Sequence, residues 1–283
     1  MDEDMDSREH IHSTCSTTQA SLHPYEREQQ AVFRVYLFGS FRVFQNNTSL
    51  EDPIWRRTRI QSLLKWFILN PEKPFSADYL ADLFWPQAST LAAHRNLRVN
   101  IHYLRHLLEP GIARGQESSF IRRLTNNFYL FHRDDTWWVD VWELQRQFEM
   151  AQQIDLSGNR KKAAFFYSKI TDYFERGFLP EDVYEDYVQP YRDRYERHHL
   201  QILRCLIEIH LQNNELDEAL EYAYRTLSID PYNQIAVNTI IDIYCKQGNH
   251  VGAMRVFNKF RDSVQAELGL EISRCSCTHI GQL

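Results

Sequence analysis

A short segment occurs three times in the second half of the chain, and it restricts the fold more than any other feature of the sequence. The three copies read GNRKKAA from residue 158, NELDEAL from residue 214 and GNHVGAM from residue 248. Their alignment places Ala163, Ala219 and Ala253 at one position, where a small side chain lets two helices approach closely. The second and third copies lie 34 residues apart, which is the period of tetratricopeptide repeats. The repeat therefore predicts stacked pairs of antiparallel helices.

Charge is distributed unevenly along the chain, although the formal total is only −6. Residues 32–133 hold 14 Lys/Arg and 7 Asp/Glu, a net charge of +7. The segment before them has a net charge of −5, and the segment from residue 134 onwards has a net charge of −8. Because a basic segment attracts polyanions, only the middle of the chain is a candidate for binding nucleic acid.

Length and composition predict two globular domains and exclude a membrane protein. A chain of 283 residues is long enough for two domains, and it contains no run of 18 apolar residues that could span a bilayer. The acidic start MDEDMDSREH does not resemble a secretory signal, and five Cys form no disulfide framework, so we expect a cytoplasmic protein. The expected boundaries are a disordered tail over 1–30, a first domain over 31–134, a second over 139–271 and a tail over 272–283.

The first domain is predicted to be a small sheet followed by three helices and a hairpin. Alternating apolar residues over 32–50 predict antiparallel strands, with a turn at Asn46–Asn47. Apolar spacing predicts helices that start near Thr58, Ser76 and Thr90, and the segment FIRRLTNNFYLF predicts two strands around a Thr-Asn-Asn turn. The predicted fold class is mostly α with small β: an N-terminal winged helix-turn-helix domain and a C-terminal tetratricopeptide-like helical array.

The helix from Thr90 to Leu108 has an unusual surface, because no carboxylate occurs between Leu83 and Leu108. Residues at helical spacing form an apolar stripe: Leu97, Ile101, Leu104 and Leu108. The opposite stripe contains Arg95, Val99, His102 and His106. The two edges between these stripes carry Arg98 and Arg105 on one side, and Asn96, Asn100 and Tyr103 on the other.

These side chains are of the kind that reads DNA: Arg pairs with guanine, Asn pairs with adenine, and an apolar group contacts the thymine methyl. The alternative is an ordinary solvated helix face. The helix-turn-helix spacing, the basic pair on the hairpin and the segment WRRTR at 55–59 favour DNA binding. The predicted DNA-binding residues are Arg56, Arg57, Arg59, Arg95, Asn96, Arg98, Val99, Asn100, His102, Arg105, Arg122 and Arg123.

The order of several segments over 32–271 resembles the Streptomyces antibiotic regulatory protein (SARP) type of activator. The matching segments are FGSFRV (38–43), WRRTRIQSLLKWFIL (55–69), ADYLADLFWP (77–86), AAHRNLRVNIHYLRHLLEP (92–110), VDVWELQRQ (139–147), LPEDVYEDYV (179–188) and VFNKFRDSVQAELGLE (256–271). The resemblance implies an OmpR-type winged helix followed by a bacterial transcriptional activator domain. It also implies sequence-specific binding to direct repeats in double-stranded DNA, a homodimer on DNA and contact with RNA polymerase.

The sequence departs from this family at the wing, where Asn127-Phe128 stands in place of Gly-Tyr; Asn tolerates the positive φ that such a turn needs. No nucleotide-binding glycine loop or catalytic motif occurs, so we expect neither a cofactor nor an enzyme. The tail holds Cys275, Cys277 and His279, but no fourth ligand is evident and we expect no metal site. Two alternative functions stay open: a repeat-based protein-interaction adaptor and a small-molecule sensor with little intrinsic DNA binding.

Overall fold

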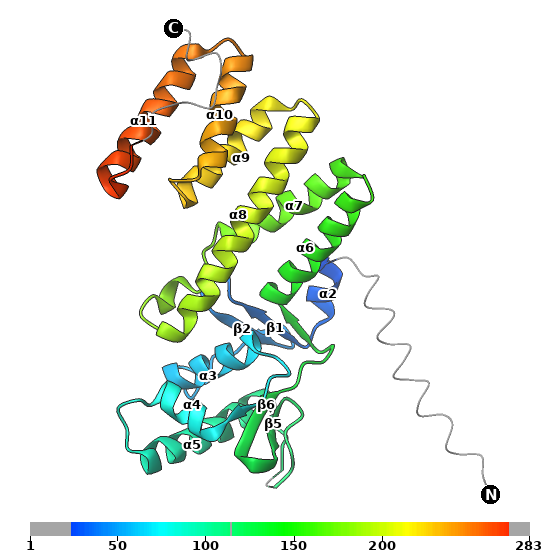
Figure 1. The fold of residues 1–283 in the computed structure, drawn as a ribbon. Coiled ribbons are helices and arrows are strands. Elements are labelled where there is room, and N and C mark those ends of the chain that lie inside the picture. Colours follow the sequence, from blue (N-terminus) through cyan, green and yellow to red (C-terminus); the bar gives the residue numbers. More distant parts are fainter. Residues whose placement is uncertain (1–23, 114, 272–283) are drawn as a thin grey trace, which may run out of the picture. The chain divides into compact units, whose positions relative to one another are not determined.

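The structure is a computed structural model that describes residues 24–113 and 115–271 (Figure 1). The chain divides into two compact units at Val139 and Asp140. Phe38–Ser40 lie within the sequence range of the first unit but group with the second unit. The expected domain boundaries at 31–134 and 139–271 stay predictions.

The first unit begins with a helix and a four-stranded sheet. The helix α2 (Pro24–Gln30) lies within the segment that we predicted to be a disordered tail, so that prediction is wrong for these residues. Its Glu28 carboxylate accepts a hydrogen bond from the Tyr36 hydroxyl at the end of β1 (Phe33–Tyr36). Burial, together with this carboxylate, raises the pKa of Tyr36 to about 12.

The sheet has the strand order β3-β2-β1-β7. As predicted, β1, β2 (Arg42–Gln45) and β3 (Thr48–Ser49) are antiparallel. The turn between β2 and β3 contains Asn46 and Asn47 with φ of 48° and 67°, a conformation that Asn adopts more readily than other side chains. The last strand, β7 (Trp137–Val139), pairs in parallel with β1 and was not predicted, because its partner lies about a hundred residues earlier in the chain.

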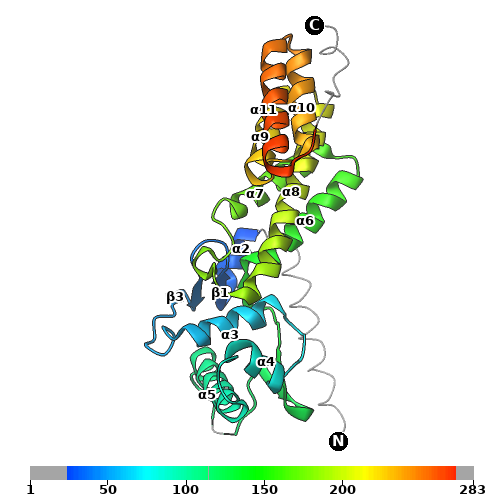
Figure 2. The same cartoon turned by 60° about the vertical axis from the view of Figure 1, so that its left-hand side comes forward.

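The three predicted helices follow, with Figure 2 showing them from the side. They are α3 (Thr58–Leu69), α4 (Ala77–Phe84) and α5 (Thr90–Leu108). Ser76 caps α4, since its hydroxyl accepts a hydrogen bond from the Tyr79 amide at 3.1 Å. A second sheet of order β4-β6-β5 contains β4 (Phe75–Ser76) and the predicted hairpin of β5 (Ile121–Leu124) and β6 (Phe128–Phe131). The hairpin after the third helix completes the winged helix-turn-helix arrangement.

The tip of this hairpin confirms the expectation for the altered wing sequence. A short 3₁₀ turn, η1 (Thr125–Asn127), joins β5 to β6. Asn126 and Asn127 both have positive φ, 57° and 61°. A residue other than Gly therefore supports the turn, because Asn enters the left-handed region at low cost.

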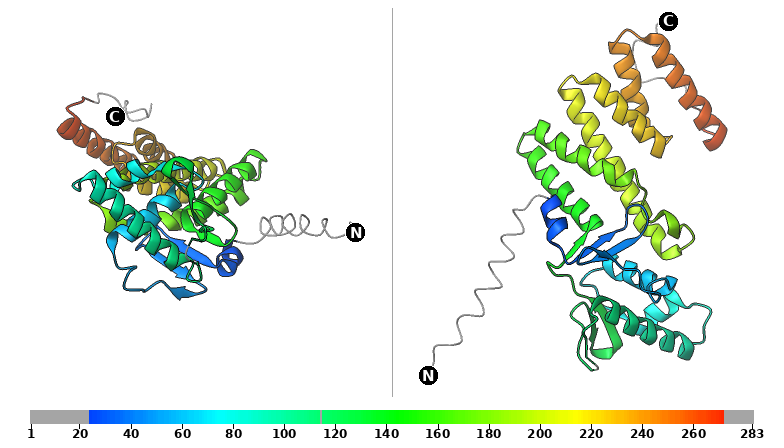
Figure 3. Two further views of the ribbon diagram at one scale, coloured as in Figure 1. Left: turned by 90° about the horizontal axis from the view of Figure 1, so that it is seen from below. Right: turned by 180° about the vertical axis from the view of Figure 1, so that it is seen from behind.

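The second unit is the predicted array of helix pairs (Figure 3). The described residues of this unit, up to 271, form the long helices α6 (Asp140–Leu156), α7 (Arg160–Phe174), α8 (Gln189–Gln212), α9 (Leu216–Ile229), α10 (Gln234–Lys246) and α11 (His250–Leu268). Two 3₁₀ turns, η2 (Pro180–Asp182) and η3 (Asp186–Val188), lie between α7 and α8. This is the insertion that lengthens the spacing between the first two copies of the repeat.

The same turn joins the helices within each pair. The first residue of each repeated segment lies in this turn and has positive φ: 84° at Gly158, 58° at Asn214 and 74° at Gly248. The amide of the next residue then donates to a carbonyl five residues earlier, as in Asn249 to Tyr244 at 2.8 Å. The repeated sequence therefore encodes a repeated helix end.

The aligned alanines lie where these helices cross, since Ala163, Ala219 and Ala253 are all 0% exposed. Around Ala253, the apolar cluster includes Val237 and Ile241 of α10. A larger side chain at these positions has no space to occupy.

We expect Ala253→Trp to lower the free energy of unfolding by about 1–3 kcal/mol, because overpacking forces neighbouring side chains and backbone to shift. The matched control is Val251→Trp on the same helix, where the native side chain is 73% exposed and a larger one meets solvent. Urea unfolding followed by circular dichroism measures both. Equal midpoints for Ala253→Trp and the unmodified protein would contradict the helix contact described here.

Candidate nucleic-acid interface

Helix α5 has one buried and one exposed side, as the sequence predicts. The buried side chains are Ala93, Leu97, Ile101, Leu104 and Leu108, and each is at most 2% exposed. Four polar or charged residues of the opposite surface, Arg95, Arg98, His102 and His106, are exposed. Val99 lies among them and is 43% exposed. The apolar stripe thus holds the helix and leaves its cationic side in solvent.

Two arginines of this exposed side are available for a ligand. Within residues 24–113 and 115–271, neither Arg95 nor Arg98 makes a hydrogen bond or an ion pair. An uncommitted guanidinium has five N–H donors in a planar fork, which suits guanine edges and phosphates. These two residues are therefore the strongest candidates for contact with DNA.

Other polar residues of α5 have partners within the first unit. The Asn100 side-chain amide donates to the Asn96 carbonyl at 2.8 Å. His94 contacts the Asp78 carboxylate of α4 at 2.8 Å. These contacts orient the side chains, and they leave the Asn100 side-chain oxygen as an acceptor.

Arg105 is committed to the wing. Its Nε and one terminal nitrogen both donate to the Ile121 carbonyl, at 2.9 and 2.7 Å. Burial lowers the pKa of this guanidinium from its ordinary value. The other N–H groups of the guanidinium stay available, so the contact of Arg105 with DNA stays a prediction. In the structure Arg105 is also a positioning residue, because it joins α5 to β5.

The arginines before α3 have different surroundings. Arg57 lies over the Tyr103 ring of α5, with its guanidinium carbon 5.1 Å from the ring centroid, which is cation–π geometry. Arg56 is exposed. Arg59 is half-buried and interacts with another group of the protein. A contact in the structure thus places Arg57 beside the predicted recognition helix.

The two wing arginines, Arg122 and Arg123, are exposed on β5. Arg123 donates to the side-chain oxygen of Asn127 at 2.8 Å, and Arg122 donates through Nε to the Ser119 carbonyl at 3.2 Å. Because each retains further N–H donors, both can still bind phosphate. The structure therefore places them where the sequence predicted, on the edge of the wing.

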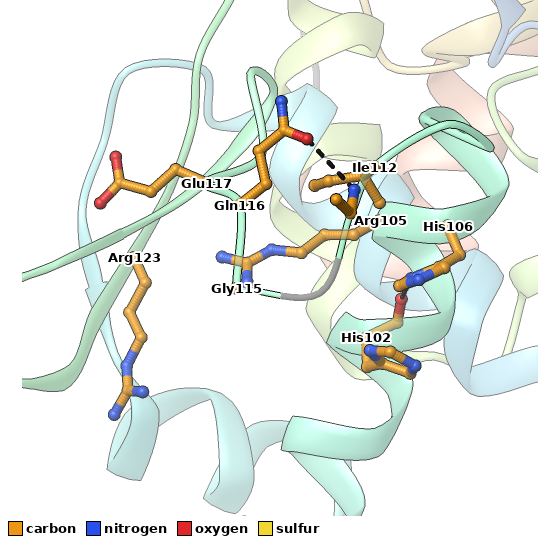
Figure 4. Close-up of a pocket in the computed structure, with 9 residues that line it drawn as sticks. His102, Arg105, His106, Ile112, Gly115, Gln116, Glu117 and Arg123 are labelled. Carbon is orange, nitrogen blue, oxygen red and sulfur yellow. Dashed lines mark hydrogen bonds between the residues drawn. The ribbon is translucent and has the colours of Figure 1, made fainter.

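A pocket of about 500 Å³ lies between the end of α5, the loop that follows it and β5 (Figure 4). Its lining residues are His102, Arg105, His106, Ile112, Ala113, Gly115, Gln116, Glu117 and Arg123. His106 and Gln116 were absent from the predicted site residues. His106 lies on the same exposed stripe as His102, and that spacing could have identified it; no sequence pattern pointed to Gln116.

The predicted Cys275, Cys277 and His279 cluster lies outside the described residues. Within the part of the chain that the structure describes, no three His, Cys, Asp or Glu side chains are grouped so that they could hold a metal ion. In the same part of the chain, every helix is too short or too polar to cross a bilayer.

Comparison with known proteins relates the second unit to a family. Residues 139–275 match the family described as the bacterial transcriptional activator domain. Among solved structures, the chain is similar to Mycobacterium tuberculosis EmbR, solved in complex with a low-affinity phosphopeptide. The TM-score is 0.71 and the identity is 14%, over 86% of this chain and 62% of the EmbR chain. No curated protein sequence matches the chain significantly.

The EmbR match shows a common fold, and the chain spans less than two thirds of the EmbR chain that it matches. The family match covers the whole helical array, from the strand that ends the first unit to beyond α11. Residues 139–275 therefore match the bacterial transcriptional activator domain family, and the fold of the chain is similar to that of EmbR.

Proposed function

We propose that the protein is a sequence-specific, double-stranded-DNA-binding transcriptional regulator that acts as an activator. The observation that supports this most directly is the exposed side of α5. There, Arg95 and Arg98 lie without intramolecular partners in the described residues beside the apolar Val99, on the third helix of a winged helix-turn-helix. A recognition helix of this kind reads base edges with its N-terminal half.

The wing provides the second part of the interface. Arg122 and Arg123 would contact the phosphate backbone next to the groove that α5 occupies, while Arg57 would contact it from the start of α3. Arg105 would hold the helix against the wing through its hydrogen bonds to Ile121. In this arrangement Arg95, Arg98, Val99 and Asn100 read sequence, and the other cations supply affinity.

The family match of the second unit supports the assignment as an activator. Following the resemblance to SARP-type regulators, the protein would bind direct repeats in promoters as a homodimer. The helical array would then place neighbouring copies and contact RNA polymerase. A repeat-based adaptor with no DNA binding is the alternative that the following experiment excludes or supports.

The experiment is selection of duplexes from a random library by the full chain, followed by affinity measurements across a salt series. We expect an enriched sequence and a log K that falls with log salt at a slope near −0.9 per phosphate neutralised. Arg98→Glu should weaken binding at low salt about tenfold or more, because it replaces a candidate contact with a repulsive charge.

The matched control is Arg255→Glu, which changes the net charge by the same amount on an exposed residue of α11. It should leave the affinity for DNA within about a factor of two, since long-range charge effects are screened at moderate salt. No enrichment and no binding at low salt would exclude the proposed function and favour the adaptor.

A further inference from the structure

The pocket between α5 and the wing contains two imidazoles that lie side by side. The ring centroids of His102 and His106 are 4.2 Å apart, and both residues are exposed. Arg105 and Arg123 line the same pocket from α5 and β5. Four nitrogen-bearing side chains thus line one hollow at the C-terminal end of the predicted recognition helix.

A hydrogen bond fixes the tautomer of His106. Its Nδ1 lies 3.0 Å from the His102 carbonyl oxygen (Figure 4). A carbonyl oxygen can only accept, so Nδ1 carries the hydrogen. In the neutral ring the proton on Nδ1 leaves a lone pair on Nε2, which repels an anion. Protonation converts Nε2 into a donor and adds a positive charge in the same step.

The other ionisable groups around the two imidazoles favour an anion. Arg105 on α5 and Arg123 on β5 are cations, and Glu117 in the intervening loop is the one carboxylate among the residues that line the pocket. In Figure 4 the Glu117 side chain extends away from the two imidazoles. The Arg123 side chain also extends away from them in Figure 4, so protonation of the histidines adds positive charge to a pocket whose nearer cation is Arg105.

We propose that this pocket is a proton-dependent binding site for a phosphate group of the DNA backbone, with His106 as the residue that provides the dependence. This inference rests on the proposed function and adds a regulatory property: affinity for DNA rises as pH falls through the range in which imidazole titrates. By thermodynamic reciprocity, a phosphate in the pocket raises the pKa of His106 to the same extent.

The first test measures the affinity of the full chain for its selected duplex at about pH 5.5 and about pH 8, on either side of the usual imidazole pKa. At constant ionic strength we expect about threefold to tenfold tighter binding at the lower pH. The salt slope should also become more negative by about one for each imidazolium that contacts a phosphate.

Three variants separate this effect from other titrations. His106→Gln cannot be protonated and should lose most of the pH dependence, binding at both pH values as the unmodified protein does at high pH. His106→Arg has a permanent charge and should bind tightly at both. His94→Gln is the matched control, because His94 lies on the same helix but contacts Asp78; it should keep the full pH dependence. If His106→Gln keeps it too, the inference is wrong while the proposed function stands.

The second test follows the histidine side chains of the full chain by NMR during pH titration, with inorganic phosphate or with duplex DNA. A rise in the pKa of His106 with either ligand identifies the pocket as a phosphate site. A rise with inorganic phosphate and none with bound duplex would assign the site to a free anion and overturn the backbone assignment. If the duplex does not bind at any pH, the proposed function fails, and an unchanged His106 in inorganic phosphate would refute the pocket independently.

Discussion

Replacing Leu104 with Ala is expected to lower the free energy of unfolding of the first unit by about 2–5 kcal/mol. Leu104 is 0% exposed in the middle of the apolar stripe of α5, so its removal leaves a cavity that the neighbouring helices fill only in part. This effect is a large fraction of the stability of a typical domain.

Urea unfolding followed by tryptophan fluorescence measures this change in the right part of the chain, because five of the six tryptophans, Trp55, Trp66, Trp85, Trp137 and Trp138, belong to the first unit. Val99→Ala is the matched control on the same helix, and it should change the free energy of unfolding by no more than about 0.5 kcal/mol. Equal effects of the two substitutions would mean that α5 does not present the face described here.

Replacing Arg95 with Ala is expected to cost about 1–3 kcal/mol of binding free energy on the selected duplex and to relax its sequence preference. Arg95 lies on the exposed side of α5 without an intramolecular partner in the described residues, so truncation removes a donor and disturbs no internal contact. Measuring binding to the selected duplex and to a scrambled duplex across a salt series gives the affinity for each duplex and the ratio of the two affinities.

Arg123→Ala provides the comparison. It should weaken binding to both duplexes by similar factors and reduce the salt slope by about one, because a wing arginine contacts phosphate. In the free protein Arg123 donates to Asn127, so its loss also tests whether that contact stabilises the wing turn. If Arg95→Ala weakened both duplexes equally, α5 would contact the backbone through this residue, and base reading would have to come from other side chains.

Local sequence patterns were sufficient for the elements whose hydrogen bonds close within a few residues. Apolar spacing predicted α3, α4 and α5, and the buried side of α5 is the predicted stripe. The repeated segment predicted the helix pairs of the second unit and the burial of Ala163, Ala219 and Ala253. In these cases the residues that determine the element also lie within it.

The sequence was less informative where the partner is distant in the chain. The parallel pairing of β7 with β1 depends on two segments about a hundred residues apart, and the three-residue strand has no alternation of its own. The short helix α2 lies in a polar segment, and it was missed because its contact with Tyr36 comes from the sheet that follows.

The candidate site also combines features that local sequence determines with features that depend on contacts between distant segments. The sequence alone determined that one helix carries cations, amides and imidazoles opposite an apolar stripe, because helical periodicity assigns each residue to a side. Only the tertiary structure decided which of these cations are available. Arg105 is held by the Ile121 carbonyl of a strand that the sequence does not place against α5, while Arg95 has no partner in the described residues. Such commitments depend on where donors and acceptors meet in space, and periodicity within one helix carries no information about the neighbouring strand.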